Sequence, residues 1–277
     1  MTVYLMLSVY PSLYFMNYKY LLGIRFWNAE TENLLILADR DGGLFTVPSA
    51  PSLGAMDNDA VLSRAYRASD WAVVDGGYVA LILRFCFGKS IRRISGLQIL
   101  QKLVGVGYRH AVPMEERTIL WVTPNGAERD AISNYLIQGN FDLNRQHFYE
   151  APFYKSEDDF ADQKLLAKAK VLSPDWIIIC IGGGRQEKLG YFIKQQFDHF
   201  QRRPVVLCTG GAISFLTGTQ ANIPTWADRL YLGWLMRIFT NPRLFGVRYL
   251  DAAWRFPKLL WTSRKHIFIE SVHPIKQ

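Results

Sequence analysis

The chain has few cysteines and no clustered metal ligands. Its 277 residues include Cys86, Cys180 and Cys208, which are far apart, lie in apolar stretches and form no CxxC pair. This distribution excludes a disulfide framework or a zinc site and predicts buried free thiols in a reducing compartment. The five histidines are equally scattered and form no HExxH pattern, so a dedicated metal cage is not expected.

Two nucleotide-binding fingerprints are also missing. The chain has neither a phosphate loop ending in Gly-Lys-Ser/Thr nor a clean GxGxxG. A P-loop nucleotidase is therefore not supported, and nor is a nicotinamide enzyme such as an epimerase.

Long uninterrupted apolar runs are missing as well. No window of about 18 residues is continuously apolar, so a membrane-spanning helix is not expected. The opening stretch Met1–Tyr20 is apolar and aromatic, but Pro11 interrupts it, and it has neither a basic start nor a small-residue cleavage site. We interpret it as a folded or membrane-leaning segment rather than a secretion signal.

Acidic residues are outnumbered, 24 against 32 lysines and arginines, which gives a formal net charge of +8. This balance favours an anionic partner, which could be nucleic acid, acidic lipid or a phosphorylated substrate. The chain has no recognisable nucleic-acid-reading module, so we expect no nucleic acid partner. A hydrophobic content of 49% is ample for the core of one large α/β domain and excludes disorder.

What the sequence does contain is a pair of glycine turns after apolar runs. Ile177–Ile181 leads into Gly182-Gly183-Gly184 and then polar residues that open a helix, and Val205–Thr209 leads into Gly210-Gly211. Glycine lets the backbone approach a ligand closely, and a helix N-terminus favours negative charge, so these turns suit a phosphate. The same pattern also occurs in tight structural connections, and the residues alone leave both interpretations open.

Strand-like runs alternate with helical patterns along most of the chain. They are Leu44–Val47, Trp71–Val74, Thr118–Thr123, Trp176–Ile181 and Val205–Thr209, with Leu34–Leu37 ambiguous. This alternation predicts an α/β fold with a doubly wound, Rossmann-like, mostly parallel sheet covered by helices. The carboxyl ends of such strands meet at one edge, where we expect one pocket. Asp75, at one of these ends, is either a helix N-cap or a catalytic base.

The C-terminal part has a different composition. Between Arg229 and Lys265, eight basic residues stand against the single acid Asp251, with aromatic residues interleaved. Interfacial helices that bind anionic lipid have this composition, and so do helices that pack aromatic residues on a main domain. We assign residues 1–225 to a Rossmann-like domain and residues 226–277 to a C-terminal helical, membrane-proximal appendage.

An ordered set of short motifs carries a more specific signal. The set comprises Leu22-Gly23-Ile24, the Val47–Leu53 stretch, Asp75-Gly76-Gly77, Arg93-Ile94-Ser95-Gly96, Ala151–Tyr154, Ser173-Pro174-Asp175, Gly184–Lys188, Gly210–Gly218, Ile223–Trp226, Trp234–Arg237, Asn241-Pro242-Arg243 and Arg248-Tyr249-Leu250. From about Leu22 to Leu250, the chain resembles the WecG/TagA/CpsF family of bacterial glycosyltransferases, glycosyltransferase family 26.

The resemblance implies a function and a location. It implies inverting transfer of a sugar from a UDP-sugar to a polyprenyl-diphosphate-linked saccharide, with no cofactor and no obligatory metal. The products of the family feed exopolysaccharide, capsule, O-antigen or teichoic acid. The enzyme would be cytoplasmic and peripheral on the inner face of the cell membrane, where its C-terminal segment helps to complete the site.

The resemblance also implies roles for individual residues. Asp75 would be the general base for the acceptor hydroxyl, and Arg93 would offset charge on the leaving diphosphate. Gln186 would bind the donor, and Glu187 would either bind it or favour the helix N-terminus. The remaining substrate-binding positions that we assign are Ser49, Gly76, Gly77, Gly183, Gly184, Gly210, Gly211, Arg243 and Arg248.

The chain departs from the family pattern at five positions. Val47 and Ser49 replace a frequent Thr and Asn, Ser214 replaces a frequent Asp, Asn222 an Arg and Gly233 a Glu. These departures leave the donor sugar open.

Other interpretations compete with this one. Asp57-Asn58-Asp59 has the Asp-x-Asp spacing of a metal-bound diphosphate site, but it follows no strand and precedes a helical pattern in which acids act as caps. A membrane-associated scaffold with a degenerate site is the non-enzymatic alternative. The sequence also leaves open whether the chain forms a homo-oligomer.

Overall fold

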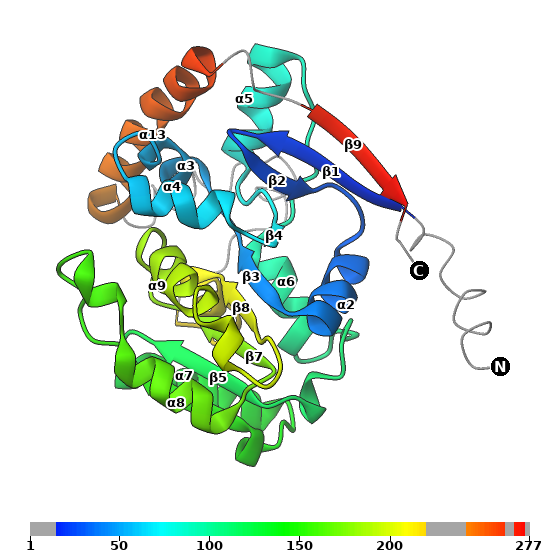
Figure 1. Ribbon diagram of the computed structural model, residues 1–277, viewed down its shortest axis with the longest axis vertical. Coiled ribbons are helices and arrows are strands. Elements are labelled where there is room, and N and C mark those ends of the chain that lie inside the picture. Colours follow the sequence, from blue (N-terminus) through cyan, green and yellow to red (C-terminus); the bar gives the residue numbers. More distant parts are fainter. Residues whose placement is uncertain (1–14, 220–241, 264–268, 275–277) are drawn as a thin grey trace.

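A computed structural model describes residues 15–219, 242–263 and 269–274. Its centre is a sheet of six parallel strands in the order β4-β3-β8-β7-β5-β6 (Figure 1). The strands are β3 (Gly43–Thr46), β4 (Trp71–Ala72), β5 (Ile119–Thr123), β6 (Gln146–Glu150), β7 (Trp176–Ile179) and β8 (Val205–Cys208). Neighbouring strands are all parallel, and the chain places β3 and β4 on one side of the sheet and β5 and β6 on the other before β7 and β8 fill the space between them. The predicted doubly wound, Rossmann-like α/β fold is confirmed.

Alternating side chains of the strands bury both faces of this sheet. In β7, Trp176 and Ile178 join one hydrophobic cluster, whereas Ile177 and Ile179 join another. The helices α2 (Thr31–Asp41), α6 (Gly96–Val104) and α7 (Gly126–Gln138) pack on the first face, and α8 (Gln163–Leu172) and α9 (Arg185–Lys194) on the second. A strand that is covered on both sides must be almost continuously apolar, as β7 is.

A third hydrophobic cluster lies beyond the β4 edge of the sheet, in the upper part of Figure 1. Side chains of α3 (Ala50–Ala55), α4 (Ala60–Arg67), α5 (Gly77–Phe87) and α13 (Pro242–Thr262) form it together with residues of β1 and β2. Phe256 and Leu260 of α13 are fully buried there. The first half of the chain and its C-terminal helix therefore share one core.

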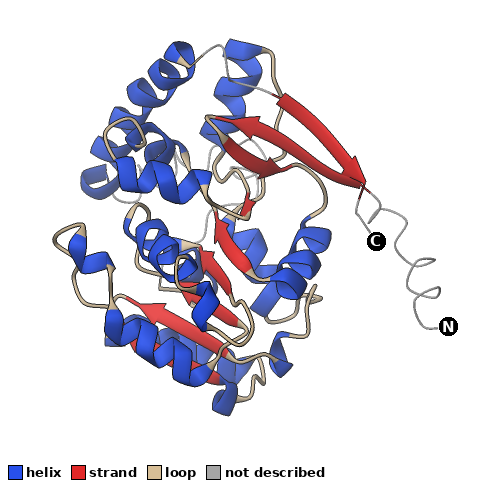
Figure 2. Cartoon of the chain, viewed as in Figure 1, coloured by secondary structure: helices blue, strands red, loops and turns tan. Residues whose placement is uncertain are grey.

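A small antiparallel sheet flanks this cluster, as Figure 2 shows in red. Its order is β2-β1-β9, made from β1 (Phe15–Leu21), β2 (Ile24–Trp27) and β9 (Ile269–Pro274). The end of the predicted C-terminal appendage thus returns to the start of the chain as a strand. The boundary at residue 225 stays a prediction, because residues 220–241 lie outside the described part.

The structure differs from the sequence-based expectations at three places. The ambiguous Leu34–Leu37 run lies within the helix α2, and β6 adds a strand that its polar residues Gln146, His147 and Glu150 concealed. Cys180 and Cys208 are buried as expected, but Cys86 is exposed. The reason is that α5 buries only Gly77, Val79 and Leu83, which leaves the apolar residues around Cys86 on its outer side.

Candidate active site at the carboxyl edge of the sheet

The loops that follow the parallel strands all begin at the same edge of the sheet. Beyond β4, Val74 forms a parallel bridge with Arg93, and the Ile94 N–H donates to the Val74 carbonyl over 3.1 Å. The Asp75 N–H in turn donates to the carbonyl of Pro48, in the loop after β3, over 3.0 Å. The predicted base Asp75 and the predicted cation Arg93 therefore lie on adjacent backbone segments, and both side chains are half-buried.

The helix cap next to Asp75 is a glycine. Gly76 is the N-cap of α5 and has φ of 93°, a conformation that favours glycine. Asp75 stands one residue before that position. Within the described ranges, a Cβ atom on Gly76 would have no heavy atom of a non-adjacent residue within 4 Å, so the described structure leaves the backbone beside Asp75 open.

Arg92 and Arg93 have different environments. Arg92 donates to both carboxylate oxygens of Glu30, over 2.7 and 2.8 Å, in an exposed ion pair. Arg93 is instead held by the backbone bridge to Val74, beside the strand end that carries Asp75.

The turn after β7 has the backbone shape that its glycines suggested. Gly182 has φ of 95° and Gly184, the N-cap of α9, has φ of 89°. A Cβ atom on either residue would have no neighbour within 4 Å among the described residues. The turn therefore presents open backbone at a helix N-terminus, where an anionic group is favoured.

Hydrogen bonds to the buried Glu187 hold this turn in its shape. Its carboxylate is 1% exposed and accepts from the Gly184 N–H over 2.6 Å and from Gln186 Nε2 over 3.0 Å. Burial raises the pKa of Glu187, although these hydrogen bonds act in the opposite direction. Both oxygens have protein partners, so the contacts give Glu187 a positioning role, and direct substrate contact stays a prediction.

Gln186 joins the two glycine turns. It is 4% exposed, and its Oε1 has no hydrogen-bond partner among the described residues. A Cβ atom on Gly210 would lie 3.4 Å from that oxygen and 3.6 Å from the Gly182 Cα. A buried amide oxygen without a partner next to open glycine backbone is typical of a ligand or water site.

The second glycine turn also contacts the segment that carries Arg93. A Cβ atom on Gly96, at the start of α6, would lie 3.2 Å from the Ala212 Cβ and 3.6 Å from the Thr209 carbonyl oxygen. Contacts therefore run from Asp75 through Arg93 and Gly96 to Gly210, Gln186 and Gly182. The structure brings these predicted residues together at one edge. It places Ser49 at the N-cap of α3, in the loop whose Pro48 binds Asp75.

Ser214, one of the departures from the family pattern, has a hydrogen-bond partner that the sequence did not predict. Ser214 lies in the short helix α10 (Ile213–Leu216), and its Oγ donates to Glu128 Oε1 over 2.7 Å. Glu128 is in the first turn of α7, which Asn125 caps by accepting from the Glu128 N–H over 2.9 Å. The sequence feature that could have identified Glu128 is the Asn125-Gly126 turn after a strand, with an acid three residues after the cap.

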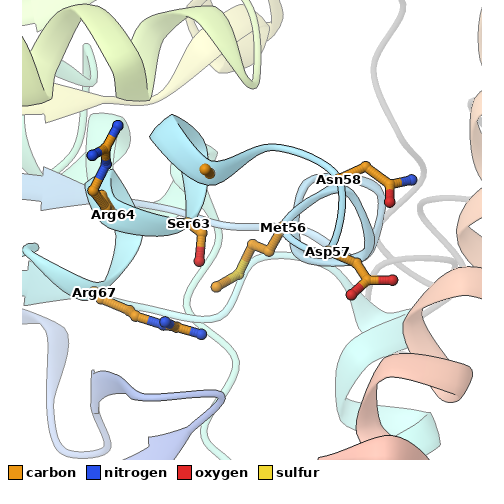
Figure 3. Close-up of a pocket in the computed structure, with 7 residues that line it drawn as sticks. Met56, Asp57, Asn58, Ser63, Arg64 and Arg67 are labelled. Carbon is orange, nitrogen blue, oxygen red and sulfur yellow. The ribbon is translucent and has the colours of Figure 1, made fainter.

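The Asp-x-Asp motif serves a structural purpose at its second acid. Asp59 is the N-cap of α4, accepts from the Leu62 N–H over 2.9 Å, and pairs with Lys188 of α9 at 2.7 Å. This confirms the capping interpretation. A cavity of about 450 Å³ opens beside it and includes Asp57, Arg64 and Arg67 in its lining (Figure 3). Among the side chains that the structure describes, none of the predicted site residues lines that cavity.

The C-terminal helix α13 packs beside the helix that follows Asp75. Tyr78 of α5 donates through its hydroxyl to the Ala253 carbonyl of α13 over 3.0 Å, and a Cβ atom on Gly54 of α3 would lie 3.3 Å from the Arg255 Cβ. Trp254 and Trp261 on α13 are 75% and 60% exposed, and Phe85 on α5 is 77% exposed. Arg243 and Arg248 lie in α13, but their side chains are outside the described ones, as are Asn222 and Gly233 entirely.

The described residues contain neither a membrane-spanning helix nor a cluster of metal ligands. None of the helices there combines the length and hydropathy needed to cross a bilayer. Within the same ranges, no three His, Cys, Asp or Glu side chains gather in an arrangement that could hold a metal ion.

Comparison with known proteins identifies related sequences over most of the chain. Residues 19–267 match the family described as "Glycosyl transferase WecG/TagA/CpsF family". An N-acetylglucosaminyldiphosphoundecaprenol N-acetyl-beta-D-mannosaminyltransferase of Bacillus spizizenii is 25% identical over 240 residues, which are 82% of this chain and 81% of that protein. A protein of the same name from Bacillus subtilis is 23% identical over 195 residues, 70% of this chain and 65% of that protein.

Proposed function

The chain belongs to the WecG/TagA/CpsF family of glycosyl transferases, and we propose that it transfers a sugar, with inversion, from a UDP-sugar to a polyprenyl-diphosphate-linked saccharide. The relatives' names describe transfer of N-acetylmannosamine to an N-acetylglucosaminyl diphosphate lipid, which supports an acceptor of this class. The product would feed a bacterial surface polysaccharide.

The observation that carries the proposal is the placement of Asp75 and Arg93 on paired backbone segments beside two open glycine turns. In the proposed reaction, Asp75 takes the proton of the acceptor hydroxyl while that oxygen attacks the anomeric carbon of the donor. The bond between this carbon and the diphosphate breaks on the opposite face. Arg93 and the N-terminus of α9 would then stabilise the charge on the departing UDP.

The turns also suggest how the donor would bind without a metal. The open backbone at Gly184 and Gly211, together with Gly183 and Gly210, would approach the diphosphate. Gln186 Oε1 would accept from a donor N–H or hydroxyl. Gly76 and Gly77 would give the acceptor access to Asp75. We assign the sugar's immediate environment to the loop that contains Ser49.

The outer surface of α5 and α13 would bring the enzyme to its lipid-linked acceptor. The exposed Phe85, Trp254 and Trp261 lie on two helices joined by the Tyr78–Ala253 hydrogen bond, and Arg84 and Lys258 add positive charge. Aromatic and basic side chains together favour an anionic lipid surface. Because α5 begins next to Asp75, this surface would hold the base near the inner face of the membrane, with Arg243 and Arg248 near diphosphate or headgroups.

Replacement of the base tests the reaction. Asp75→Asn should lower the rate of sugar transfer at least about a hundredfold, the usual minimum for loss of a positioned base. Transfer would be measured with UDP-N-acetylmannosamine, other UDP-sugars and an N-acetylglucosaminyl-diphosphate lipid, first without metal and then with magnesium. UDP binding, measured by calorimetry, should change little.

Asp57→Asn is the matched control, because Asp57 is exposed and belongs to the Asp-x-Asp motif that we reject. It should leave transfer unchanged. If Asp57→Asn abolishes transfer and magnesium is required, the metal-bound diphosphate site is correct instead. No transfer and no UDP binding by the unaltered protein would favour the scaffold.

A further inference from the structure

Glu128 is close to both glycine turns, although its motif did not mark it as a functional residue. Its carboxylate accepts from Ser214, three residues after Gly211, over 2.7 Å. The same carboxylate raises the pKa of the buried Cys180 thiol, two residues before Gly182, in addition to the larger effect of burial. Glu128 is therefore close to the end of β7 as well as to the turn after β8.

One oxygen of this carboxylate remains available. Ser214 occupies Oε1, and among the described residues no hydrogen bond reaches Oε2. The side chain is half-buried, so it is accessible from the carboxyl edge. At the end of β5, directly before the α7 turn, the buried Thr123 Oγ1 has no hydrogen-bond partner in the described structure. Together with Gln186 Oε1, unpartnered polar atoms thus lie on both sides of the turn after β7.

The charge of Glu128 limits what it can bind. A carboxylate repels a diphosphate, so it would not contact the phosphates that the glycine turns favour. A carboxylate does bind the hydroxyls of a ribose, as an acid at a neighbouring strand end does in dinucleotide-binding folds. The ribose of a nucleoside diphosphate is attached directly to the phosphates, and β5 is the immediate neighbour of β7.

We propose that Glu128, oriented by Ser214, binds the ribose hydroxyls of the donor nucleotide and so fixes which end of the site holds the nucleoside. This inference rests on the proposed function. Asp75 follows β4 and Glu128 follows β5, which are four strand positions apart, or roughly 19 Å at about 4.8 Å per step. The diphosphate would lie between them, with the nucleoside over β5 and β7 and the acceptor over β4.

The proposal also accounts for the departure at Ser214. Where the family often has an aspartate, this chain has a hydroxyl that holds a carboxylate supplied by α7. A carboxylate is therefore present beside position 214, but it belongs to Glu128 of α7.

Calorimetry with UDP and 2′-deoxy-UDP tests the ribose contact. The unaltered protein should bind UDP roughly tenfold or more tightly than 2′-deoxy-UDP, as expected for a hydrogen bond to a charged group. Glu128→Gln should weaken UDP binding and bring the two affinities within about twofold of each other. The variant keeps the size of the side chain and an oxygen for Ser214, so the fold should be retained.

Asp130→Asn is the control, because Asp130 lies on the same helix and pairs with Arg129 in an exposed contact. It removes the same charge and should preserve the preference for UDP. Equal binding of the two nucleotides by the unaltered protein would overturn the ribose contact alone, and so would an unchanged preference in Glu128→Gln. Failure of the unaltered protein to bind either nucleotide would instead count against the proposed function.

A second pair of variants tests the role of Ser214. Ser214→Asp places two carboxylates together and should weaken UDP binding by repulsion. Adding Glu128→Gln to Ser214→Asp restores a single carboxylate and should recover the preference for UDP over 2′-deoxy-UDP. If the folded double variant binds UDP no better than Ser214→Asp, Ser214 does not orient the ribose-binding carboxylate.

Discussion

The two ends of the site differ in how far contacts within the protein hold them in place. Around the turn after β7, Glu187 holds Gly184 and Gln186, while Lys188 pairs with Asp59 and with Glu157. Around α5 and α13, by contrast, Phe85, Trp254 and Trp261 are mostly exposed. The first region is built before any ligand arrives, whereas the second exposes apolar surface that a partner can cover.

This difference matches the two substrates that we propose. A soluble nucleotide sugar needs a rigid, preorganised site, because ordering the protein on binding would reduce the affinity. A lipid-linked acceptor is delivered by the membrane, so the enzyme needs a surface that binds there and a base beside it. Three changes test this division, from the largest expected effect to the smallest.

The largest effect should come from the open backbone at Gly184. Gly184→Ala adds a Cβ where φ is 89°, which costs about 1–2 kcal/mol of stability, and places a methyl group on the face that we assign to the diphosphate. UDP affinity, measured by calorimetry, should fall more than about tenfold.

Gly88→Ala separates strain from binding. Gly88 ends α5 with φ of 63°, and a Cβ atom there would also have no neighbour within 4 Å. Gly88→Ala should lower the melting temperature about as much as Gly184→Ala does, and it should leave UDP affinity unchanged. Equal loss of UDP affinity in both variants would show that the turn after β7 has no special role in binding.

The next effect concerns the exposed region. Replacing Trp254 by Ala should reduce binding to vesicles of phosphatidylglycerol about tenfold, because a buried large apolar side chain contributes about 1.5–3 kcal/mol. UDP affinity and the melting temperature should change little. Sedimentation of the protein with the vesicles measures the effect.

Tyr108→Ala controls for the loss of an exposed aromatic residue, since Tyr108 follows α6 and lies outside the third hydrophobic cluster. It should leave vesicle binding intact. If the tryptophan variant binds vesicles as well as the unaltered protein, the exposed residues of α13 do not face the membrane, and the division between the two regions fails there.

Local patterns predicted the sheet and the glycine turns well, for a physical reason. A parallel strand covered on both faces is almost continuously apolar, so β7 and β8 are visible in the sequence. β6 is only partly buried, and its polar residues concealed it. The pairing of β9 with β1 is equally invisible, because it joins segments about 250 residues apart whose contact depends on the rest of the fold.

Candidate site residues could be predicted only where a local motif marks them. Asp75 and Arg93 were predicted from two separate motifs, and the pairing of Val74 with Arg93 brings those segments together. Glu128 was missed because its partner Ser214 is far away in sequence and comes close only when α7 and α10 pack. Glu187 was found, but its burial and its two protein partners could not be inferred from a position in the first turn of a helix.

The smallest effect should come from the buried acid beneath the glycine turn, and its pH dependence has a definite sign. Burial raises the pKa of Glu187 above its usual 4.5, so the folded protein binds this proton more tightly than the unfolded chain does. The resulting contribution to stability is complete below the unfolded pKa and is lost as the pH rises through the folded value. The glutamine of the Glu187→Gln variant cannot ionise. The melting temperature of this variant should therefore increase relative to that of the unaltered protein as the pH rises above about 4.5.

Thermal melts at several pH values measure this difference, which should amount to a few degrees at most, with Glu157→Gln as an exposed control. A constant difference across the range would mean that Glu187 has the same pKa in the folded and unfolded states. Its hydrogen bonds to Gly184 and Gln186 would then fully offset its burial. The turn after β7 would be held by an ordinary carboxylate, and its rigidity would have to come from the packing of α9 against the sheet.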